Sequence, residues 1–344
     1  MTLWKVGLPV LQVIGLVTTA VRPPMKGPQR PPEAQSAVQP PSTEPAPARR
    51  PSAAGAKSPM SYTITCGARS LDLSAPRIMG ILNVTPDSFS DGGQLYQDGR
   101  VQIDAVLRRA EEMCSSGAEI LDVGGESTRP GAAPVAESEE SDRVLTAVEA
   151  IVSRIDVIIS VDTSTPSIMT ASGRLGAGLL NDVRGFRRPG ALESAAGTGL
   201  AMCLMHMQGE PDTMQHDPSY DDVITDLDVF FDAQLDRLQA AGVPRDRIII
   251  DPGFGFGKTA QQNFEMLARL SELAAKRVPI LVGLSRKSMI SSVLDRPPEA
   301  RVFASVGLAM MAVERGARIV RVHDVAATSD ALAMWRAVSQ VKPS

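Results

Sequence analysis

The chain has 344 residues, of which 43% are hydrophobic and 22% are charged, and its formal net charge at pH 7 is −4. This length allows one large domain or two of ordinary size, and the lack of a basic excess argues against nucleic acid as the main partner. The three cysteines, Cys66, Cys114 and Cys203, have no paired spacing, which argues against a disulfide framework or a zinc site and favours a cytoplasmic protein.

The first 59 residues differ in composition from the rest of the chain. They hold 12 of the 26 prolines and carry seven Lys and Arg residues against two acidic ones. Residues 22–59 have almost no large apolar side chains, so we expect this segment to be disordered. Residues 1–21 are apolar but marginal as a membrane span, and no membrane association is expected. The favoured interpretation is that residues 1–59 lie upstream of the true start at Met60; a targeting segment and an inert tail are the alternatives.

A compact domain is predicted over residues 60–344. The segment TITCGARSLDL predicts a short β-hairpin with Gly67 at its turn. Eight apolar runs follow, separated by helix-length gaps, and such continuous runs are typical of parallel strands buried on both faces. Each run ends at a polar or charged residue: Asn83, Asp122, Asp162, Asn181, His206, Asp251, Lys287 and His323. Eight strand–helix units predict a (β/α)8 TIM barrel closed at one end by the hairpin and preceded by the disordered extension.

Amphipathic stretches between the runs predict the helices of the barrel. Pro166 suits the first position of one of them, and the acidic residues after Ala136 suit the first turn of another. A glycine follows several of these stretches, as expected at helix C-termini. The predicted helices lie at about 101–116, 138–154, 166–175, 190–197, 221–241, 260–276, 299–315 and 328–340, and the glycines are Gly117, Gly176, Gly199, Gly242 and Gly316.

Two long, polar, glycine-rich loops follow the first two strands, at residues 83–93 and 123–132. Phe89 is an aromatic residue on the first loop and is expected to act as a lid. Arg129, followed by Pro130, presents a guanidinium group on a stiffened turn. Either loop alone could be a plain surface turn, but two such loops at the same end of adjacent strands favour a functional role.

Carboxylate and amide groups end the third, fourth and sixth strands, at Asp162, Asn181 and Asp251. Such a ring suits a flat heterocycle with several N–H donors, because a carboxylate can accept two parallel hydrogen bonds. For Asp162 a helix N-cap is the competing interpretation. The segment after Asp251, DPGFGFGK, lacks the spacing of a phosphate-binding P-loop, and we expect it to place Phe254 or Phe256 over the ring of a ligand.

The last two strands lead to basic groups. Ser288, beside Lys287 at a predicted helix start, suits an anion. Arg321 and His323 should face the barrel mouth, since inward positions recur every two residues. A buried arginine requires an anionic partner, which is either a ligand phosphate or the carboxylate of Asp122 or Asp324. No histidine cluster favours permanent zinc, whereas Mg2+ held mostly by water and substrate phosphate is compatible.

Taken together, these segments resemble one family, the dihydropteroate synthases of the bacterial folate pathway. The resemblance covers Met60 to about Val341 and rests on GILNVTPDSFSDGG, DVGGESTRPGA, ISVDTS, LLNDVRG, CLMHMQG, DPGFGFGK, GLSRKSMI and RVHDV. It implies a cytoplasmic, homodimeric transferase that is a sulfonamide target. In the implied reaction, the amine of 4-aminobenzoate attacks the exocyclic methylene of 6-hydroxymethyl-7,8-dihydropterin diphosphate, so that diphosphate leaves and 7,8-dihydropteroate forms.

The resemblance also implies roles for particular residues. The pterin would be bound by Asp122, Asp162, Asn181, Asp251 and Lys287, and Met205 and Phe256 would also be substrate-binding residues. The diphosphate and Mg2+ would lie by Asn83, Arg321 and His323, with Asn83 as the metal ligand. The aminobenzoate would be held by Phe89, Thr128, Arg129, Pro130 and Ser288. Asn83, Lys287, Arg321 and His323 would be catalytic, through charge stabilisation and positioning rather than through a nucleophile or strong base.

Two other functions share parts of this pattern. A pterin-binding barrel that transfers a methyl group from methyltetrahydrofolate to a corrinoid would share the Asp and Asn residues. It should lack the GGESTRPGA and SRKS segments, which are present here. A non-catalytic pterin-binding homologue is the second alternative, and the presence of Asn83, Arg129, Lys287, Arg321 and His323 argues against it.

Overall fold

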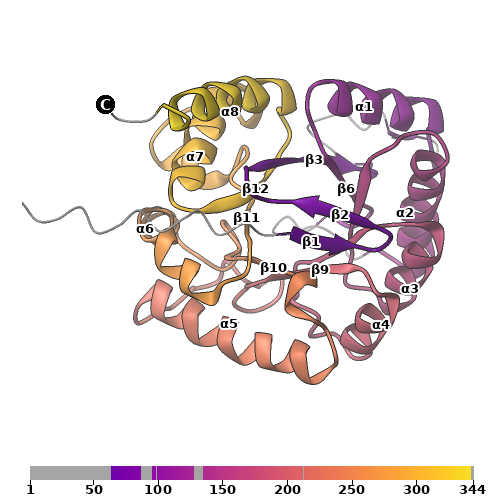
Figure 1. Cartoon of the computed structure of the whole chain (residues 1–344), viewed down its shortest axis with the longest axis horizontal. Helices are drawn as coiled ribbons and strands as arrows, with labels where there is room; N and C mark the ends of the chain where they lie inside the picture. The colour runs from indigo at the N-terminus through magenta and orange to yellow at the C-terminus, as the bar shows by residue number, and fades with distance from the viewer. Residues whose placement is uncertain (1–62, 87–94, 98, 128–134, 212, 342–344) are drawn as a thin grey trace, which may run out of the picture. The chain divides into compact units, whose positions relative to one another are not determined.

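The computed structural model describes residues 63–86, 95–97, 99–127, 135–211 and 213–341. Within this part of the chain, eight parallel strands form a closed barrel, in which each strand pairs with the next and the last pairs with the first (Figure 1). In order around the barrel they are β3 (Arg77–Asn83), β6 (Ile120–Gly124), β7 (Ile158–Asp162), β8 (Leu179–Asp182), β9 (Ala201–Met205), β10 (Ile248–Asp251), β11 (Ile280–Val282) and β12 (Ala317–Val322). The predicted TIM barrel is confirmed.

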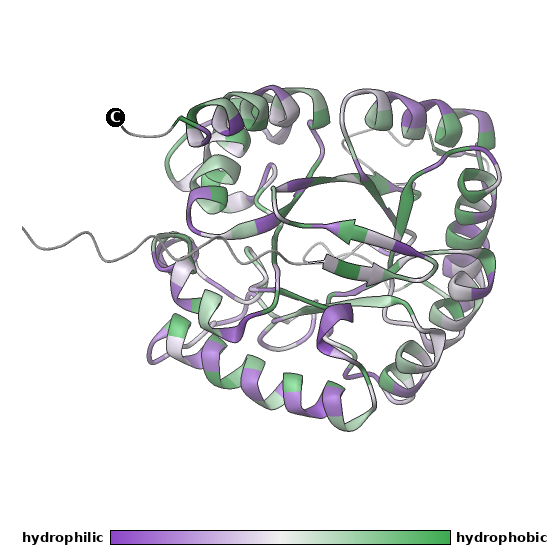
Figure 2. Ribbon diagram, viewed as in Figure 1, coloured by the Kyte–Doolittle hydropathy of each residue, from purple (hydrophilic) through white to green (hydrophobic). Residues whose placement is uncertain are grey.

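Helices surround the barrel, as Figure 1 shows. The α-helices are α1 (Ile103–Ser115), α2 (Glu137–Val152), α3 (Pro166–Leu175), α4 (Ala191–Thr198), α5 (Val223–Ala240), α6 (Ala260–Ala268), α7 (Val302–Glu314) and α8 (Val325–Ser339). Short 3-10 helices lie at η1 (Arg245–Arg247), η2 (Leu270–Lys276), η3 (Ser288–Ser292) and η4 (Pro298–Ala300). Figure 2 shows polar and apolar residues alternating along these helices, as expected when one face packs on the barrel. Among the described helices, none is long and apolar enough to cross a membrane.

The helix ends follow the sequence signals. Pro166 is the first residue of α3, and Glu137, Glu139 and Glu140 lie in the first turn of α2. The five predicted C-terminal glycines all have left-handed backbone angles, with φ between 76° and 108°, which glycine adopts without the steric cost that a Cβ would bring.

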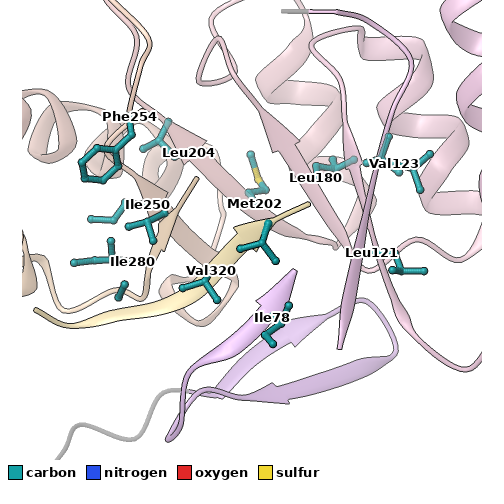
Figure 3. Close-up of a cluster of buried hydrophobic side chains, with 14 of the residues drawn as sticks. Ile78, Leu121, Val123, Leu180, Met202, Leu204, Ile250, Phe254, Ile280 and Val320 are labelled. Atoms are coloured by element: carbon teal, nitrogen blue, oxygen red, sulfur yellow. The ribbon is translucent and has the colours of Figure 1, made fainter. Parts of the chain in front are cut away.

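Each barrel strand has two buried faces. The outward side chains pack against the helices and form the larger apolar core, of which Figure 3 shows Ile78, Leu121, Leu180 and Val320. The inward side chains fill the lower barrel with a second cluster, to which every barrel strand contributes. This inner cluster contains Met79, Ile120, Ile158, Leu179, Ala201, Cys203, Ile249, Leu281 and Ile319 from the barrel. The continuous apolar runs in the sequence arise because both faces are buried.

The predicted N-terminal hairpin closes this lower end. Strands β1 (Thr63–Cys66) and β2 (Arg69–Asp72) pair antiparallel, and Gly67 in the turn has a φ of 60°. Figure 1 shows the hairpin lying across the barrel, and its side chains Ile64, Cys66 and Leu71 belong to the inner cluster. The barrel is therefore sealed with apolar groups at the end where its strands begin.

Three details differ from the expectation. Strand β11 stops at Val282, five residues before Lys287, and its register against β12 shifts between Ile280 and Leu281. The helix expected at 260–276 divides into α6 and the 3-10 helix η2. A small hairpin, β4 (Tyr96–Gln97) with β5 (Arg100–Val101), was not predicted because two-residue strands leave no periodic signal.

Candidate functional site

The alternation along the strands carries polar groups into the upper barrel. Met79, Ile120 and Ile319 face inward in the lower cluster, and side chains two or four residues further along a strand point the same way. This register brings together the predicted residues Asn83, Asp122, Asp162, Asn181, Met205, Asp251 and Arg321 at the C-terminal end of the barrel. Active sites of this fold lie at that end.

Asp122 is at the centre of this group and is fully buried. Its carboxylate accepts hydrogen bonds from Ser160 Oγ at 2.5 Å and from Asn181 Nδ2 at 3.2 Å. Arg321 Nε donates to it at 2.6 Å. A buried carboxylate is tolerated only with such partners, so this side chain is held in one orientation.

Arg321 links two of the carboxylates, because its Nη2 also donates to Asp162 Oδ2 at 2.8 Å. The structure thus contains the ion pair with Asp122 that the sequence offered as one alternative. The other suggested partner was wrong, since Asp324 pairs with Arg286. Burial, together with the neighbouring Asp122 carboxylate, raises the pKa of Asp162, and Arg321 opposes this rise.

Asn181 holds an unsatisfied acceptor. Its Nδ2 donates to Asp122, whereas its Oδ1 is buried and has no hydrogen-bond partner among the described residues. An orphaned buried carbonyl oxygen costs about 1–3 kcal/mol. A ligand with an N–H group at this position would satisfy it.

Asp251 and Lys287 carry opposite charges, and each charge affects the pKa of the other group. Asp251 Oδ1 accepts the Gly253 N–H at 2.8 Å, and burial raises the pKa of Asp251 to about 6. Burial, followed by the Arg321 charge, lowers the pKa of Lys287 to about 8, although Asp251 and Asp162 oppose this. The Lys287 ammonium lies 4.1 Å from the centroid of the Phe256 ring, a cation–π distance.

The segment after β10 bends sharply so that its two phenylalanines separate. Gly253 has a φ of 72°, and a Cβ there would lie 1.9 Å from the carbonyl oxygen of His206, so only glycine fits. Phe254 is 1% exposed and belongs to the outer core shown in Figure 3. Of the two candidates for a ligand contact, Phe254 is therefore excluded, and Phe256 lies beneath Lys287.

Lys258 is a buried residue that the sequence reasoning missed. Its ammonium contacts His206 Nδ1 at 3.1 Å and donates to the carbonyl oxygens of Gly253 at 3.1 Å and Phe256 at 3.0 Å. Burial lowers the pKa of Lys258 to about 7, and burial followed by the Lys258 charge lowers that of His206 to about 2. His206 is therefore a neutral part of the loop structure.

Asp182 was missed for a different reason, since it is the last residue of β8 and points out of the barrel. It is fully buried and accepts hydrogen bonds from Ser164 Oγ and from the backbone N–H groups of Arg184 and Phe186. Arg184 in turn pairs with Glu126 on the loop after β6. This network connects three of the loops that border the site.

Replacing Asp182 with Ala is expected to lower the free energy of unfolding by about 2–4 kcal/mol, because three buried donors lose their acceptor. Urea denaturation would measure the change. The matched control is Asp72→Ala, which removes similar bonds to the Ser74 N–H and Oγ from an exposed position and should be far milder. Equal effects of the two substitutions would contradict a bracing role for Asp182.

Of the remaining predicted residues, the structure describes His323 and Ser288 but not those on the two glycine-rich loops. His323 follows β12, and its Nδ1 lies 2.9 Å from Ser285 Oγ. Ser288 is exposed and begins η3. Phe89, Thr128, Arg129 and Pro130 lie outside the described residues, so the expected aminobenzoate contacts on the two loops stay predictions.

The donor set suits Mg2+ only as an ion that arrives with a phosphate. Among the described residues, no cluster of three or more His, Cys, Asp or Glu side chains could hold a metal. Asn83 Oδ1 and the Asp162 side chain both lie beside Gly124, and Asp162 is already paired with Arg321. Mg2+ retains water and phosphate ligands readily and needs few protein oxygens, so Asn83 fits as a single protein ligand.

Comparisons with known proteins agree with this site. Residues 79–323 match the family described as pterin binding enzyme. The dihydropteroate synthase of Escherichia coli (strain K12) is 51% identical over 273 residues, which cover 79% of this chain and 95% of that protein. The structure resembles Yersinia pestis dihydropteroate synthase in complex with a sulfonamide drug, with a TM-score of 0.78, 51% identity, and coverage of 81% of this chain and 100% of that chain. For the Xanthomonas albilineans enzyme with 4-aminobenzoic acid, the TM-score is 0.76, the identity 44%, and the coverage 82% and 100%. The chain belongs to the dihydropteroate synthase family of pterin-binding enzymes.

Proposed function

We propose that this protein condenses 6-hydroxymethyl-7,8-dihydropterin diphosphate with 4-aminobenzoate, giving 7,8-dihydropteroate and diphosphate in folate biosynthesis. The observation that carries the proposal is an edge of polar groups in the upper barrel, in which Asn181 donates to Asp122 and the charges of Asp251 and Lys287 act on each other. This edge presents acceptors and donors to a flat heterocycle, and Asn181 Oδ1 still requires a donor.

The pterin ring would be recognised by its pattern of donors and acceptors. Asp251 would accept from the 2-amino edge of the pterin, since a carboxylate matches such an edge with two parallel hydrogen bonds. Asn181 Oδ1 would accept a ring N–H, and Lys287 would donate to the ring carbonyl and a ring nitrogen. Met205, in an apolar cluster that packs against Phe256, would line the apolar side.

The diphosphate would bind at the end of the eighth strand, where Arg321 lies in β12 and His323 follows it, near Asn83. Arg321 is 20% exposed, so its guanidinium is reachable from the upper barrel while Asp122 and Asp162 hold it in place. Charge stabilisation of the leaving diphosphate is the main catalytic effect required here. A Mg2+ ion carried by the diphosphate would add further charge neutralisation to the leaving group.

The direct test uses the 344-residue chain with the pterin diphosphate, 4-aminobenzoate and Mg2+, and measures diphosphate release. We expect release only when aminobenzoate is present, inhibition by a sulfonamide, and loss of release on chelation of Mg2+. Pterin binding without any release would contradict the synthase activity and favour the non-catalytic homologue. A shortened chain that begins at Met60 tests in the same assay whether residues 1–59 are needed.

We also propose that the protein forms a homodimer through α7 and α8. Phe303 is 86% exposed and Met311 is 49% exposed on one face of α7, and Met334 and Val338, 67% and 70% exposed, lie one turn apart on α8. Large exposed apolar side chains on adjacent helices are typical of an interface. Light scattering should give twice the chain mass, and Phe303→Glu should give the monomer; a monomeric native protein would contradict this.

A further inference from the structure

The loops that follow β11 and β12 are joined at two successive residues. Ser285 Oγ accepts the His323 N–H at 3.2 Å and lies 2.9 Å from His323 Nδ1. Next to it, Arg286 forms a two-bond ion pair with Asp324, with Nε–Oδ2 at 3.1 Å and Nη2–Oδ1 at 2.6 Å. Both side chains of this pair are more than four-fifths buried. The two contacts therefore tie the loop that carries Lys287 to the residues around His323.

Arg286 is itself held in a costly backbone conformation. Its φ is 59°, a left-handed value that costs a non-glycine residue on the order of 1 kcal/mol or more. The surroundings fix this conformation, because its N–H donates to Ser305 Oγ at 2.9 Å and its carbonyl oxygen accepts from Arg301 Nη1 at 3.1 Å. A strained residue held from three sides sets the direction in which the chain enters the next residue, Lys287.

Lys287 needs such guidance because a lysine side chain has much rotational freedom, worth about 2 kcal/mol. In this structure its ammonium lies over the Phe256 ring, and Gly255 allows the close approach, since a Cβ there would lie 3.1 Å from Lys287 Cδ. The Arg286–Asp324 pair adds a rigid, planar link of the kind that a lysine cannot reproduce.

We infer that Arg286 is a positioning residue, which acts through its pair with Asp324 to hold Lys287 and His323 at a fixed separation. The inference rests on the proposed function, in which Lys287 binds the pterin and His323 binds the diphosphate of the same substrate. The bond that breaks joins the methylene carbon to the diphosphate oxygen. A fixed separation of Lys287 and His323 keeps this bond aligned between the pterin site and the diphosphate site. A displacement of about 1 Å in such a site can cost 100-fold in rate.

The test is a pair of conservative substitutions, Arg286→Lys and Asp324→Asn, each of which removes the two-bond pair. We expect each to lower kcat by roughly 10- to 100-fold while KM for 4-aminobenzoate changes by less than about 3-fold. The double variant should be no worse than the poorer single variant, because both substitutions remove one interaction. Arg269→Lys is the matched control, since Arg269 has a two-bond pair with Glu272 on the surface, and it should leave kcat unchanged.

A pH profile separates positioning from a general structural effect. The alkaline limb of kcat/KM for the pterin substrate should begin near pH 8 in the native protein, where Lys287 loses its proton. In the Arg286 and Asp324 variants a less confined Lys287 should titrate at higher pH, since less burial raises a lysine pKa. These variants leave the other charged groups that interact with Lys287 unchanged. Those groups are Asp251, Asp162, Arg321 and Lys258.

The outcomes are distinct. Native kcat in both variants would overturn the inference while leaving the proposed function intact. Lower kcat with an unmoved alkaline limb and a lower Tm would also overturn it, because the pair would then serve stability alone. If the native protein itself released no diphosphate, the proposed function would fail, and the role assigned to Arg286 would fail with it.

Discussion

Arg321→Ala is expected to slow aminobenzoate-dependent diphosphate release by roughly two to three orders of magnitude, the size of effect found when one charge-stabilising donor is lost. The guanidinium is the positive group that the fold places between Asp122 and Asp162, with 20% of its side chain still exposed. Its removal takes away the charge that, in the proposed function, faces the leaving diphosphate. Single-turnover measurement of diphosphate release gives the chemical step directly.

The same substitution leaves two carboxylates without their common partner, so the folded protein should also lose stability. Turnover must therefore be measured well below the Tm and corrected for the folded fraction by circular dichroism. Arg269→Ala, which removes a network with Asp222, Glu265 and Glu272, controls for the loss of ion pairs elsewhere. Near-normal turnover of folded Arg321→Ala would exclude Arg321 from catalysis.

Lys287→Ala should lower kcat/KM for the pterin substrate by about 100-fold at pH 7, because a charge-assisted donor to the ring is worth roughly 1.5–3 kcal/mol. In the native protein the same parameter should fall as the pH rises above about 8. The sign follows from the charge: burial lowers the pKa of Lys287, so the protonated form exists below pH 8 and is lost above it. Profiles of kcat/KM report ionisation in the free enzyme.

Lys287→Arg provides the control for this pH dependence. The arginine keeps its charge beyond pH 12, so the alkaline limb should disappear even though the altered geometry lowers the overall value. Ionisations of the substrates are common to both proteins and cancel in the comparison. An alkaline limb that persists unchanged in Lys287→Arg would assign it to another group.

The sequence predicts the barrel well because its strands are buried on both faces and so read as continuous apolar runs. A polar residue at the end of such a run does not serve the core, and this indicates a site residue. Asp122, Asp162, Asn181 and Asp251 were found in this way, and the structure brings them together. Two-residue alternation then accounts for Arg321, which contacts two of them.

What escaped prediction depends on contacts between loops far apart in sequence. Asp182 follows Asn181 directly, and only the observed pleat shows that it turns outward to brace a loop. In the sequence, Lys258 is only the last residue of a glycine-rich turn. In the structure, its ammonium contacts His206 Nδ1 and donates to the carbonyl oxygens of Gly253 and Phe256, which holds the turn together. The pairing of Asp324 with Arg286 rather than Arg321 depends on a left-handed residue in the loop after β11.

The hairpin that seals the lower barrel has a consequence for protein engineering. Its side chains Ile64, Cys66 and Leu71 pack where the barrel strands begin, whereas the predicted substrate contacts that the structure describes lie further along the strands. Enzymes commonly lose activity when their active sites are stabilised. In this barrel, substitutions of hairpin core residues such as Cys66 would fall away from the substrate contacts that the structure describes. Variants that resist heat or organic solvent can therefore be sought there without altering the residues that are expected to bind the substrates.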